Sequence, residues 1–212
     1  MFERLLGLDF EVRTYDVRKG EYPAQVGSHA GYLITGSPAG VYEDHHWIEP
    51  LKDWLRSAKG RARLVGICFG HQIMAEAFGG RVVKAERGWS IGLHRYEILS
   101  AEPWMDVPAA ISVPVSHQDQ IVALPPGSRV VAGNAFSPFG ILAYGDQPAL
   151  SLQCHPEFEP EFAAALIETR RDRLPDPDAA LATLAGPNDR ARVAEWIRSF
   201  LKGEVGGQAS GD

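Results

Sequence analysis

A cysteine between two glycines, Cys68, is the most reactive side chain that the sequence offers. It follows the apolar run 63–67 and precedes a run with helical spacing, so it lies on a strand-to-helix turn. Glycines at 66 and 70 suit such a turn, because side chains there would collide with the tight backbone. The N–H groups and dipole of a helix N-terminus favour a thiolate and stabilise a substrate anion. The pattern predicts a nucleophile, although by itself it also fits a buried structural cysteine.

A second candidate lies at the end of the apolar run 149–153, which is followed by His155-Pro156-Glu157. Pro156 cannot donate to a strand ladder, so the strand ends and His155 is left at its tip, where parallel sheets place ligands. Residues two apart in an extended chain face the same way, so Glu157 can fix the tautomer of the imidazole and stabilise its protonated form. Together with Cys68, this predicts a Cys-His-acid arrangement.

Two further segments could line the same site. The apolar run 31–35 ends in the glycine-containing turn 36–40, whose backbone amides can approach a ligand closely. This turn could add an oxyanion donor opposite the amide of Phe69, although a plain turn would have the same composition. The segment 115–119, Val-Ser-His-Gln-Asp, could offer contacts to a polar substrate.

The order of elements must bring these segments together. Helical spacing marks 47–55 and 72–78, and the chain becomes mainly helical after residue 158, with candidate helices at 160–171, 176–184 and 188–201. Runs rich in β-branched and aromatic residues are strand candidates, at 11–17, 31–35, 63–67, 81–84, 93–99, 128–132, 141–144 and 149–153. Early alternation of strand and helix predicts parallel βαβ units, and the closely spaced strands between 81 and 144 predict antiparallel hairpins at an edge. The expected class is α/β.

Composition excludes several other classes of protein. The chain has 212 residues and a formal net charge of −6, which argues against a nucleic-acid surface. No apolar run approaches the roughly 20 residues that span a bilayer, and no signal pattern opens the chain, so we expect no membrane contact and a cytoplasmic protein. No metal-ligand spacing or nucleotide-binding motif occurs, so we expect no cofactor. One domain over residues 1–202 and a flexible tail at 203–212 are predicted.

The motifs taken together resemble those of a known family. GICFGHQ, an upstream Thr-Gly-Ser-Pro turn, VSHQD and QCHPEF occur in this order over roughly residues 10–170. The set resembles class I (triad) glutamine amidotransferases, most closely stand-alone members similar to the amidotransferase domain of GMP synthase. The resemblance implies a flavodoxin-like three-layer sandwich with a mostly parallel sheet and an antiparallel extension. It also implies hydrolysis of a γ-glutamyl amide through a thioester on Cys68, with His155 as base and then acid and with Glu157 orienting it.

The resemblance also implies roles for the surrounding residues. The amides of Gly36 and Phe69 would form the oxyanion hole. The side chain of Gln72 and the backbone at Ser116 and His117 would hold the α-amino and α-carboxylate groups of the substrate.

Two departures from the family pattern are visible. Members carry a strand before the helix that matches residues 1–6, and here none precedes it. The expectation is either that the chain start is placed too late or that the fold tolerates the loss. In bifunctional relatives a synthetase domain follows, and here only about 50 residues of helix and tail come after His-Pro-Glu.

Three functions remain open at this stage. The protein could release ammonia from glutamine, handing it to a separate synthetase subunit or to water. It could instead act as a γ-glutamyl peptidase on glutathione-type peptides or conjugates. A non-catalytic binding protein is the third possibility, but a binding role gives no reason for the Cys68, His155 and Glu157 set.

Overall fold

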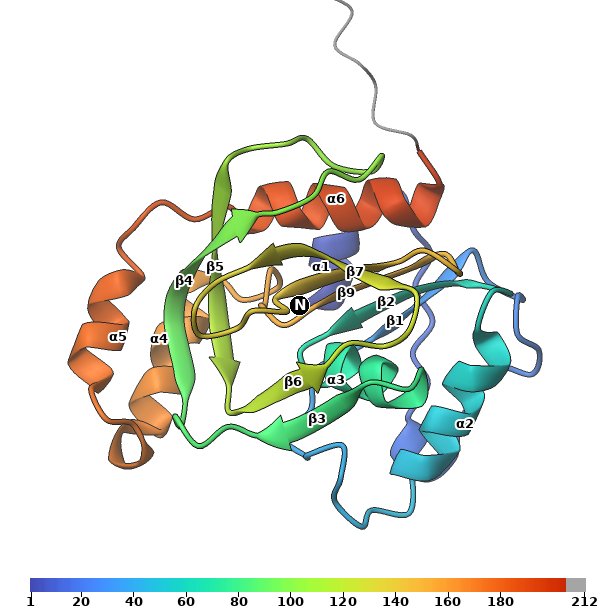
Figure 1. Ribbon diagram of the computed structural model, residues 1–212, viewed down its shortest axis with the longest axis horizontal. Coiled ribbons are helices and arrows are strands. Elements are labelled where there is room, and N and C mark those ends of the chain that lie inside the picture. Colours follow the sequence, from blue (N-terminus) through green and yellow to red (C-terminus); the bar gives the residue numbers. More distant parts are fainter. Residues whose placement is uncertain (205–212) are drawn as a thin grey trace, which may run out of the picture.

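A seven-stranded sheet runs through the centre of the molecule, with helices on both faces (Figure 1). In this computed structural model, which describes residues 1–204, the strand order is β1-β2-β9-β8-β7-β4-β5. The strands β1, β2 and β9 pair in parallel, and every other neighbouring pair in the sheet is antiparallel. Their bounds are β1 Gly31–Ile34, β2 Arg63–Ile67, β4 Ser90–Ile98, β5 Ala110–His117, β7 Ser128–Gly133, β8 Ile141–Tyr144 and β9 Ala149–Leu152. The predicted α/β class with an antiparallel extension is confirmed.

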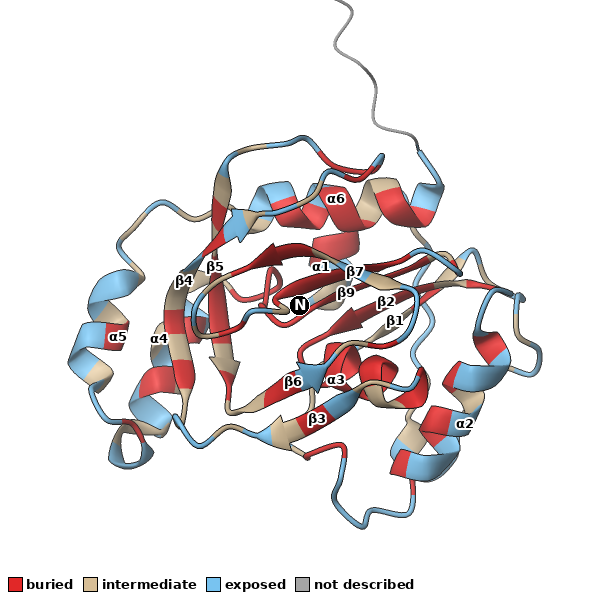
Figure 2. Cartoon of the chain, in the orientation of Figure 1, coloured by how far each residue is buried: buried red, intermediate tan, exposed pale blue. Residues whose placement is uncertain are grey.

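The strands separate two apolar layers, because successive side chains point to opposite faces. In β2, Val65 and Ile67 pack into the layer under α1 and α6, whereas Leu64 packs into the layer under α2 and α3. The central strands are therefore buried on both faces (Figure 2). Of the covering helices, α2 and α6 each keep an exposed side, whereas α3 is buried along almost its whole length. These helices are α1 Phe2–Leu6, α2 Ile48–Ala58, α3 Phe69–Ala77 and α6 Arg190–Lys202.

Two further helices, α4 Pro160–Thr169 and α5 Pro177–Thr183, pack beside β4 at the antiparallel end of the sheet. Each begins with proline, whose fixed φ suits the first helical position. The carboxylate of Asp176 caps α5 by accepting from the backbone N–H of Ala179 at 2.9 Å. Short 3-10 turns occupy Val17–Lys19 and Arg171–Arg173. The helices predicted at 160–171, 176–184 and 188–201 are thus present with slightly different ends.

The predicted strand at 11–17 is wrong. Residues 11–16 have no regular structure, and the 3-10 turn begins at Val17. A β-rich run becomes a strand only when its N–H and C=O groups find a ladder partner. The edge strand β1 pairs only with β2, so 11–16 remain outside the sheet.

Strands β5 and β6 were not among the sequence candidates. Pro114 interrupts the apolar pattern of β5, but β5 is an edge strand, where a missing N–H is tolerated. The strand β6, Asp119–Ala123, pairs with β3, Arg81–Lys84, in a separate two-stranded sheet. The hairpin prediction implied that the 81–84 run joins the edge of the main sheet, and this part of the prediction is wrong.

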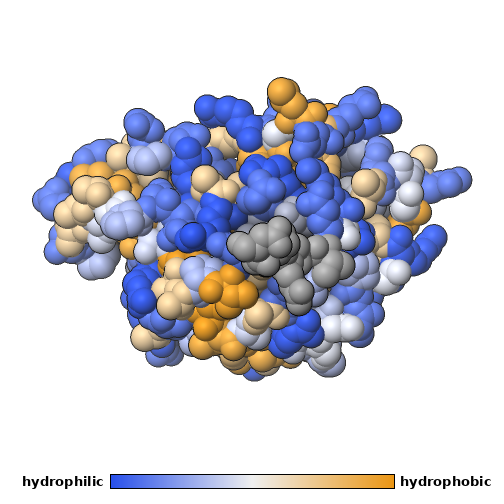
Figure 3. All heavy atoms as spheres, turned by 90° about the horizontal axis from the view of Figure 1, so that it is seen from above, coloured by the Kyte–Doolittle hydropathy of each residue, from blue (hydrophilic) through white to orange (hydrophobic). Residues whose placement is uncertain are grey.

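The outer surface over α6 is covered mainly by hydrophilic side chains, with small hydrophobic groups between them (Figure 3). Within residues 1–204, no helix combines the length and the apolar character that a bilayer crossing requires. The predicted tail at 203–212 lies, from residue 205 onward, outside the described residues.

Candidate active site

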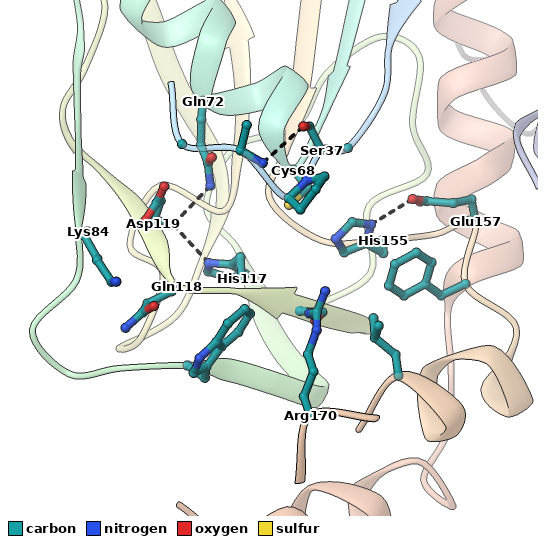
Figure 4. Close-up of a pocket in the computed structure, with 18 of the residues that line it drawn as sticks. Ser37, Cys68, Gln72, Lys84, His117, Gln118, Asp119, His155, Glu157 and Arg170 are labelled. Atoms are coloured by element: carbon teal, nitrogen blue, oxygen red, sulfur yellow. Dashed lines mark hydrogen bonds and ion pairs between the residues drawn. The ribbon is translucent and has the colours of Figure 1, made fainter. Parts of the chain in front are cut away.

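Cys68 lies between the end of β2 and the start of α3, in a backbone conformation that side chains rarely adopt. Its φ is 53° and its ψ is −102°, and among residues 1–204 it is the one non-glycine residue with a positive φ. The conformation is held by the N–H of Cys68, which donates to the carbonyl of Leu152 at 2.8 Å. Strain of this kind persists where the surrounding structure enforces it, commonly at active sites. The turn directs the thiol into a pocket (Figure 4).

The two flanking glycines are sterically required. A Cβ on Gly66 would lie 2.5 Å from the carbonyl oxygen of Gly70, and a Cβ on Gly70 would lie 2.1 Å from the carbonyl oxygen of Ile34. Both distances are too short for any side chain. The G-x-C-x-G spacing thus reflects close packing of the turn against α3 and β1.

His155 follows β9, which is the neighbour of β2 in the sheet. Its backbone N–H donates to the carbonyl of Pro114 in β5 at 2.8 Å, and its ring stacks on Phe158 with centroids 4.0 Å apart. The Nδ1–H of the ring donates to Oε1 of Glu157 at 2.7 Å, and both side chains are buried. The carboxylate therefore sets the tautomer, which leaves Nε2 free for the other side of the ring.

The thiol and the imidazole lie side by side in the pocket (Figure 4). Gly36, just beyond β1, is in reach of both: a Cβ there would lie 3.3 Å from Cε1 of His155 and 3.8 Å from Cβ of Cys68. The structure thus gathers Cys68, His155 and Glu157 at the carboxyl ends of parallel strands.

Electrostatics distinguish His155 from the other buried histidines. Burial disfavours its protonated form, but Cys68 and Glu157, through their charges and hydrogen bonds, outweigh burial and raise the pKa of His155 well above its ordinary value. Burial instead lowers the pKa of His117 and of His71 to about 3, so both rings stay neutral. The imidazole between the thiol and the carboxylate thus differs from His117 and His71 in that its surroundings favour the doubly protonated, cationic form.

The two candidate oxyanion donors are backbone amides on either side of the thiol. Gly36 lines the pocket, and Phe69 supplies the first N–H of α3. Neither N–H donates a hydrogen bond to another residue of the described chain. Both amides are therefore available to an anion.

The predicted substrate contacts Gln72 and His117 converge on one backbone group. The Nε2 of Gln72 and the Nδ1 of His117 both donate to the carbonyl of Asp119, each at 3.1 Å. The Asp119 carboxylate accepts from the hydroxyl of Tyr42 at 3.0 Å, and burial raises the pKa of Asp119. These side chains line the pocket as one connected network.

Ser116 lies on the opposite side, where sequence analysis missed its partner. Its hydroxyl accepts from Nη1 of Arg170 at 2.6 Å, and the Arg170 guanidinium lies over the ring of Trp89, 5.0 Å from its centroid. Arg170 is followed by Arg171 at the end of a helix, and two adjacent arginines in such a position are typical of a solvent-exposed surface. The feature of the sequence that could have revealed it is the spacing of four residues from Phe162 to Leu166 and again from Leu166 to Arg170.

The pocket that these residues line has a volume of about 430 Å³. Such a volume accommodates a small-molecule ligand. Within residues 1–204, no cluster of three or more His, Cys, Asp and Glu side chains has the geometry to hold a metal ion. The arrangement suits acyl transfer to a thiol, with an acid-base imidazole and amides for the anion.

Comparison with known proteins gives a consistent family. The family model described as Glutamine amidotransferase class-I matches residues 3–169. Gamma-glutamyl peptidase 3 of Arabidopsis thaliana is 25% identical over 205 residues, which cover 89% of this chain and 82% of that protein. The glutamine-hydrolyzing GMP synthase of Thermomicrobium roseum is 36% identical over 131 residues, which cover 61% of this chain and 24% of that protein.

A similar fold occurs among solved structures. A glutamine amido transferase from Methylobacillus flagellatus matches 100% of this chain and 92% of its own, with a TM-score of 0.77 and 20% identity. At this level of identity the likeness concerns the fold alone.

Proposed function

Since the chain belongs to the class I glutamine amidotransferase family, we propose that it hydrolyses a γ-glutamyl amide through a thioester on Cys68. One observation carries the proposal: the strained Cys68 turn opens into the same pocket as the His155–Glu157 pair. A purely structural cysteine would need neither the positive φ nor a buried ion-paired imidazole beside it.

The first step is attack of the Cys68 sulfur on the γ-carbonyl carbon, with the proton held on His155. A C–S bond forms, and the carbonyl electron pair moves onto oxygen. The amides of Gly36 and Phe69 stabilise this oxyanion, because they are preorganised donors that have no partner within residues 1–204. The dipole of α3 adds to this effect at its N-terminus.

The second step breaks the C–N bond. His155 gives its proton to the departing nitrogen, so the product leaves as neutral ammonia or amine and the γ-glutamyl thioester remains. Water then attacks the thioester while His155 removes a proton from it, the C–S bond breaks, and glutamate is released. Glu157 keeps Nδ1 protonated throughout, which presents Nε2 to the reacting groups.

Gln72 and the backbone at Ser116 and His117 would bind the α-amino and α-carboxylate groups of the γ-glutamyl unit. Gln72 is buried and already oriented by the Asp119 carbonyl, so little conformational entropy is lost when it binds.

The proposal is tested by a glutamine-mimicking alkylator followed by mass spectrometry of the peptides. We expect one adduct, on Cys68. Cys154 is a matched control inside the same chain, because it is fully buried and burial raises its pKa. Cys68→Ala is expected to lose both the adduct and the turnover while it keeps its melting temperature. Absence of an adduct on native wild-type protein, or unchanged turnover in Cys68→Ala, would contradict the mechanism.

The similar proteins suggest two candidates for the leaving group, ammonia or a larger amine. The γ-glutamyl peptidase similarity extends over most of both chains, which favours an amine larger than ammonia. Similarity to GMP synthases covers about a quarter of those proteins, so ammonia release would call for a separate synthetase subunit. Assaying free ammonia and free peptide with glutamine and glutathione as substrates distinguishes the two. Binding of both compounds without turnover would indicate a non-catalytic binding protein.

A further inference from the structure

One face of α4 forms a wall of the pocket. Phe162, Leu166 and Arg170 are spaced by four residues, so they lie on the same side of the helix and its C-terminal cap, and all three line the pocket with Cys68. Figure 4 shows the Arg170 side chain extending into the pocket toward Cys68 and His155.

The wall begins at the catalytic imidazole and is aromatic. Phe158 stacks on the His155 ring, and Phe162 meets Phe158 edge-on with centroids 4.7 Å apart. Phe162 is 40% exposed although it is large and apolar. An exposed aromatic side chain inside a pocket is a typical contact for an apolar part of a ligand.

Arg170 ends this wall with an unneutralised charge. Its one hydrogen bond goes to the neutral hydroxyl of Ser116, and within residues 1–204 no carboxylate lies within ion-pair distance. The neighbouring Arg171 differs, since it pairs with both Glu168 at 2.8 Å and Asp178 at 3.0 Å. Burial lowers the pKa of Arg170, and the charge of Cys68 opposes this effect. A partly buried guanidinium that stacks on Trp89 keeps the in-plane donors that Ser116 does not use free for a planar anion.

The chemistry decides which part of a substrate reaches this wall. His155 must donate its proton to the departing nitrogen, so the leaving group lies against His155 and, beyond it, against the α4 face. We propose that this face of α4 and the neighbouring Trp89 form a leaving-group subsite, lined by Phe162, Leu166 and Arg170. In this subsite, Arg170 binds the free carboxylate of an amino acid or peptide leaving group. The inference rests on the proposed γ-glutamyl hydrolysis and narrows its substrate class to γ-glutamyl amino acids and peptides with an apolar body.

Arg170 takes no part in bond making in this scheme. The C–N bond breaks, the amine takes the proton of His155, and the carboxylate stays ionised on Arg170 throughout. Ammonia is too small to touch Phe162 or Arg170, so the wall contributes nothing to glutamine hydrolysis. The contact between Arg170 and the carboxylate therefore affects the relative kcat/KM of substrates with different leaving groups.

The test compares kcat/KM for γ-glutamylleucine, its C-terminal amide and glutamine, each with wild type, Arg170→Gln and Arg173→Gln. We expect wild type to prefer the free acid over the amide, and Arg170→Gln to reduce that preference by about 10- to 100-fold, as for loss of a charge-assisted hydrogen bond. Arg173 is a matched control, because it is exposed and does not line the pocket. Arg170→Lys should recover part of the preference, since it keeps the charge but loses the planar fork.

The possible outcomes distinguish a failure of the proposed subsite from a failure of the proposed reaction. A wild type that shows no preference, or an Arg170→Gln variant that keeps it, overturns the subsite. An equal loss on glutamine and on the peptide assigns Arg170 to the α-carboxylate common to all substrates and also overturns it. If wild type turns over none of the three compounds and Cys68 resists the alkylator, the proposed function itself fails. Melting temperatures check that the variants fold.

Discussion

The two sides of the pocket differ in how their polar groups are satisfied. On the α3 side, Gln72 and His117 share the carbonyl of Asp119, and Tyr42 donates to its carboxylate. On the α4 side, Arg170 has one neutral partner, and its neighbours are aromatic or aliphatic. A connected hydrogen-bond network fixes side chains before a ligand arrives, whereas a guanidinium without a carboxylate partner beside apolar rings can bind an anion.

The difference suggests a division of labour around the central Cys68–His155 pair. The α3 side has a fixed set of groups, as expected for the γ-glutamyl unit, which is the same in every substrate. The α4 side has the features that would discriminate among leaving groups. Changes to the central pair should therefore affect all substrates, and changes to one side should affect only what that side binds.

The largest effect is expected at the centre. His155→Asn should lower kcat on every γ-glutamyl substrate by about 10²- to 10⁴-fold, because general acid-base catalysis is lost. The measurement is steady-state kinetics on glutamine and on a γ-glutamyl peptide. His46→Asn is the control, since that ring is exposed and lies outside the pocket. A loss on one substrate alone would contradict a central role.

The pH dependence of Cys68 alkylation sharpens this point. Because the pKa of His155 is raised, the imidazolium persists at neutral pH and is lost as the pH rises through that value. Wild type should therefore react with the alkylator at pH 6, while His155→Asn should require roughly pH 8.5, where an unassisted thiol ionises. The stability that the ion-paired imidazolium contributes is fully present below the ordinary histidine pKa and disappears on the alkaline side. Equal pH profiles for the two proteins would exclude the ion pair.

An intermediate effect is expected on the α3 side. Gln72→Ala should lower kcat/KM by about 10-fold, from loss of one or two hydrogen bonds to the γ-glutamyl unit. The reduction should be the same for glutamine, γ-glutamylleucine and its amide. Gln120→Ala is the control, because Gln120 is also buried but does not line the pocket. If Gln72→Ala changed the ratio of kcat/KM between substrates with different leaving groups, Gln72 would contact the leaving group and not the γ-glutamyl unit.

The smallest effect is expected at Tyr42. Tyr42→Phe removes the hydroxyl that orients Asp119, and Asp119 in turn holds Gln72 and His117. Because the effect is indirect, KM should rise by at most about fivefold, equally for all substrates, with kcat little changed. Isothermal titration of glutamate, the common product, into wild type and variant gives an independent measure. A large fall in kcat would show that the network also positions the catalytic pair.

Much of the site could be predicted from local chain properties. The need for glycine at Gly66 is local, because a Cβ there would meet the carbonyl oxygen of Gly70, whereas Gly70 is required by the close approach of Ile34 in β1. The His155-Pro156-Glu157 run also encodes its own geometry, because a proline ends the strand and an acid two residues on faces the ring. The prediction of a strand at 11–17 was wrong for the opposite reason, because a strand forms only where a partner strand from another part of the chain lies beside it.

The sequence by itself determined the strand-turn-helix at Cys68, the strand end at His155 and the α/β class, since these follow from steric limits and periodicity within short segments. Only the tertiary structure decided that the Asp119 carbonyl joins Gln72 to His117 and that Arg170 faces the pocket with Ser116 as its hydrogen-bond partner. It also decided that the pKa of His155 is raised by Cys68 and Glu157, whereas burial lowers the pKa of His117. The physical reason is that burial, charge pairing and hydrogen-bond partners depend on groups far apart in the chain, and the distances between such groups exist only in the folded molecule.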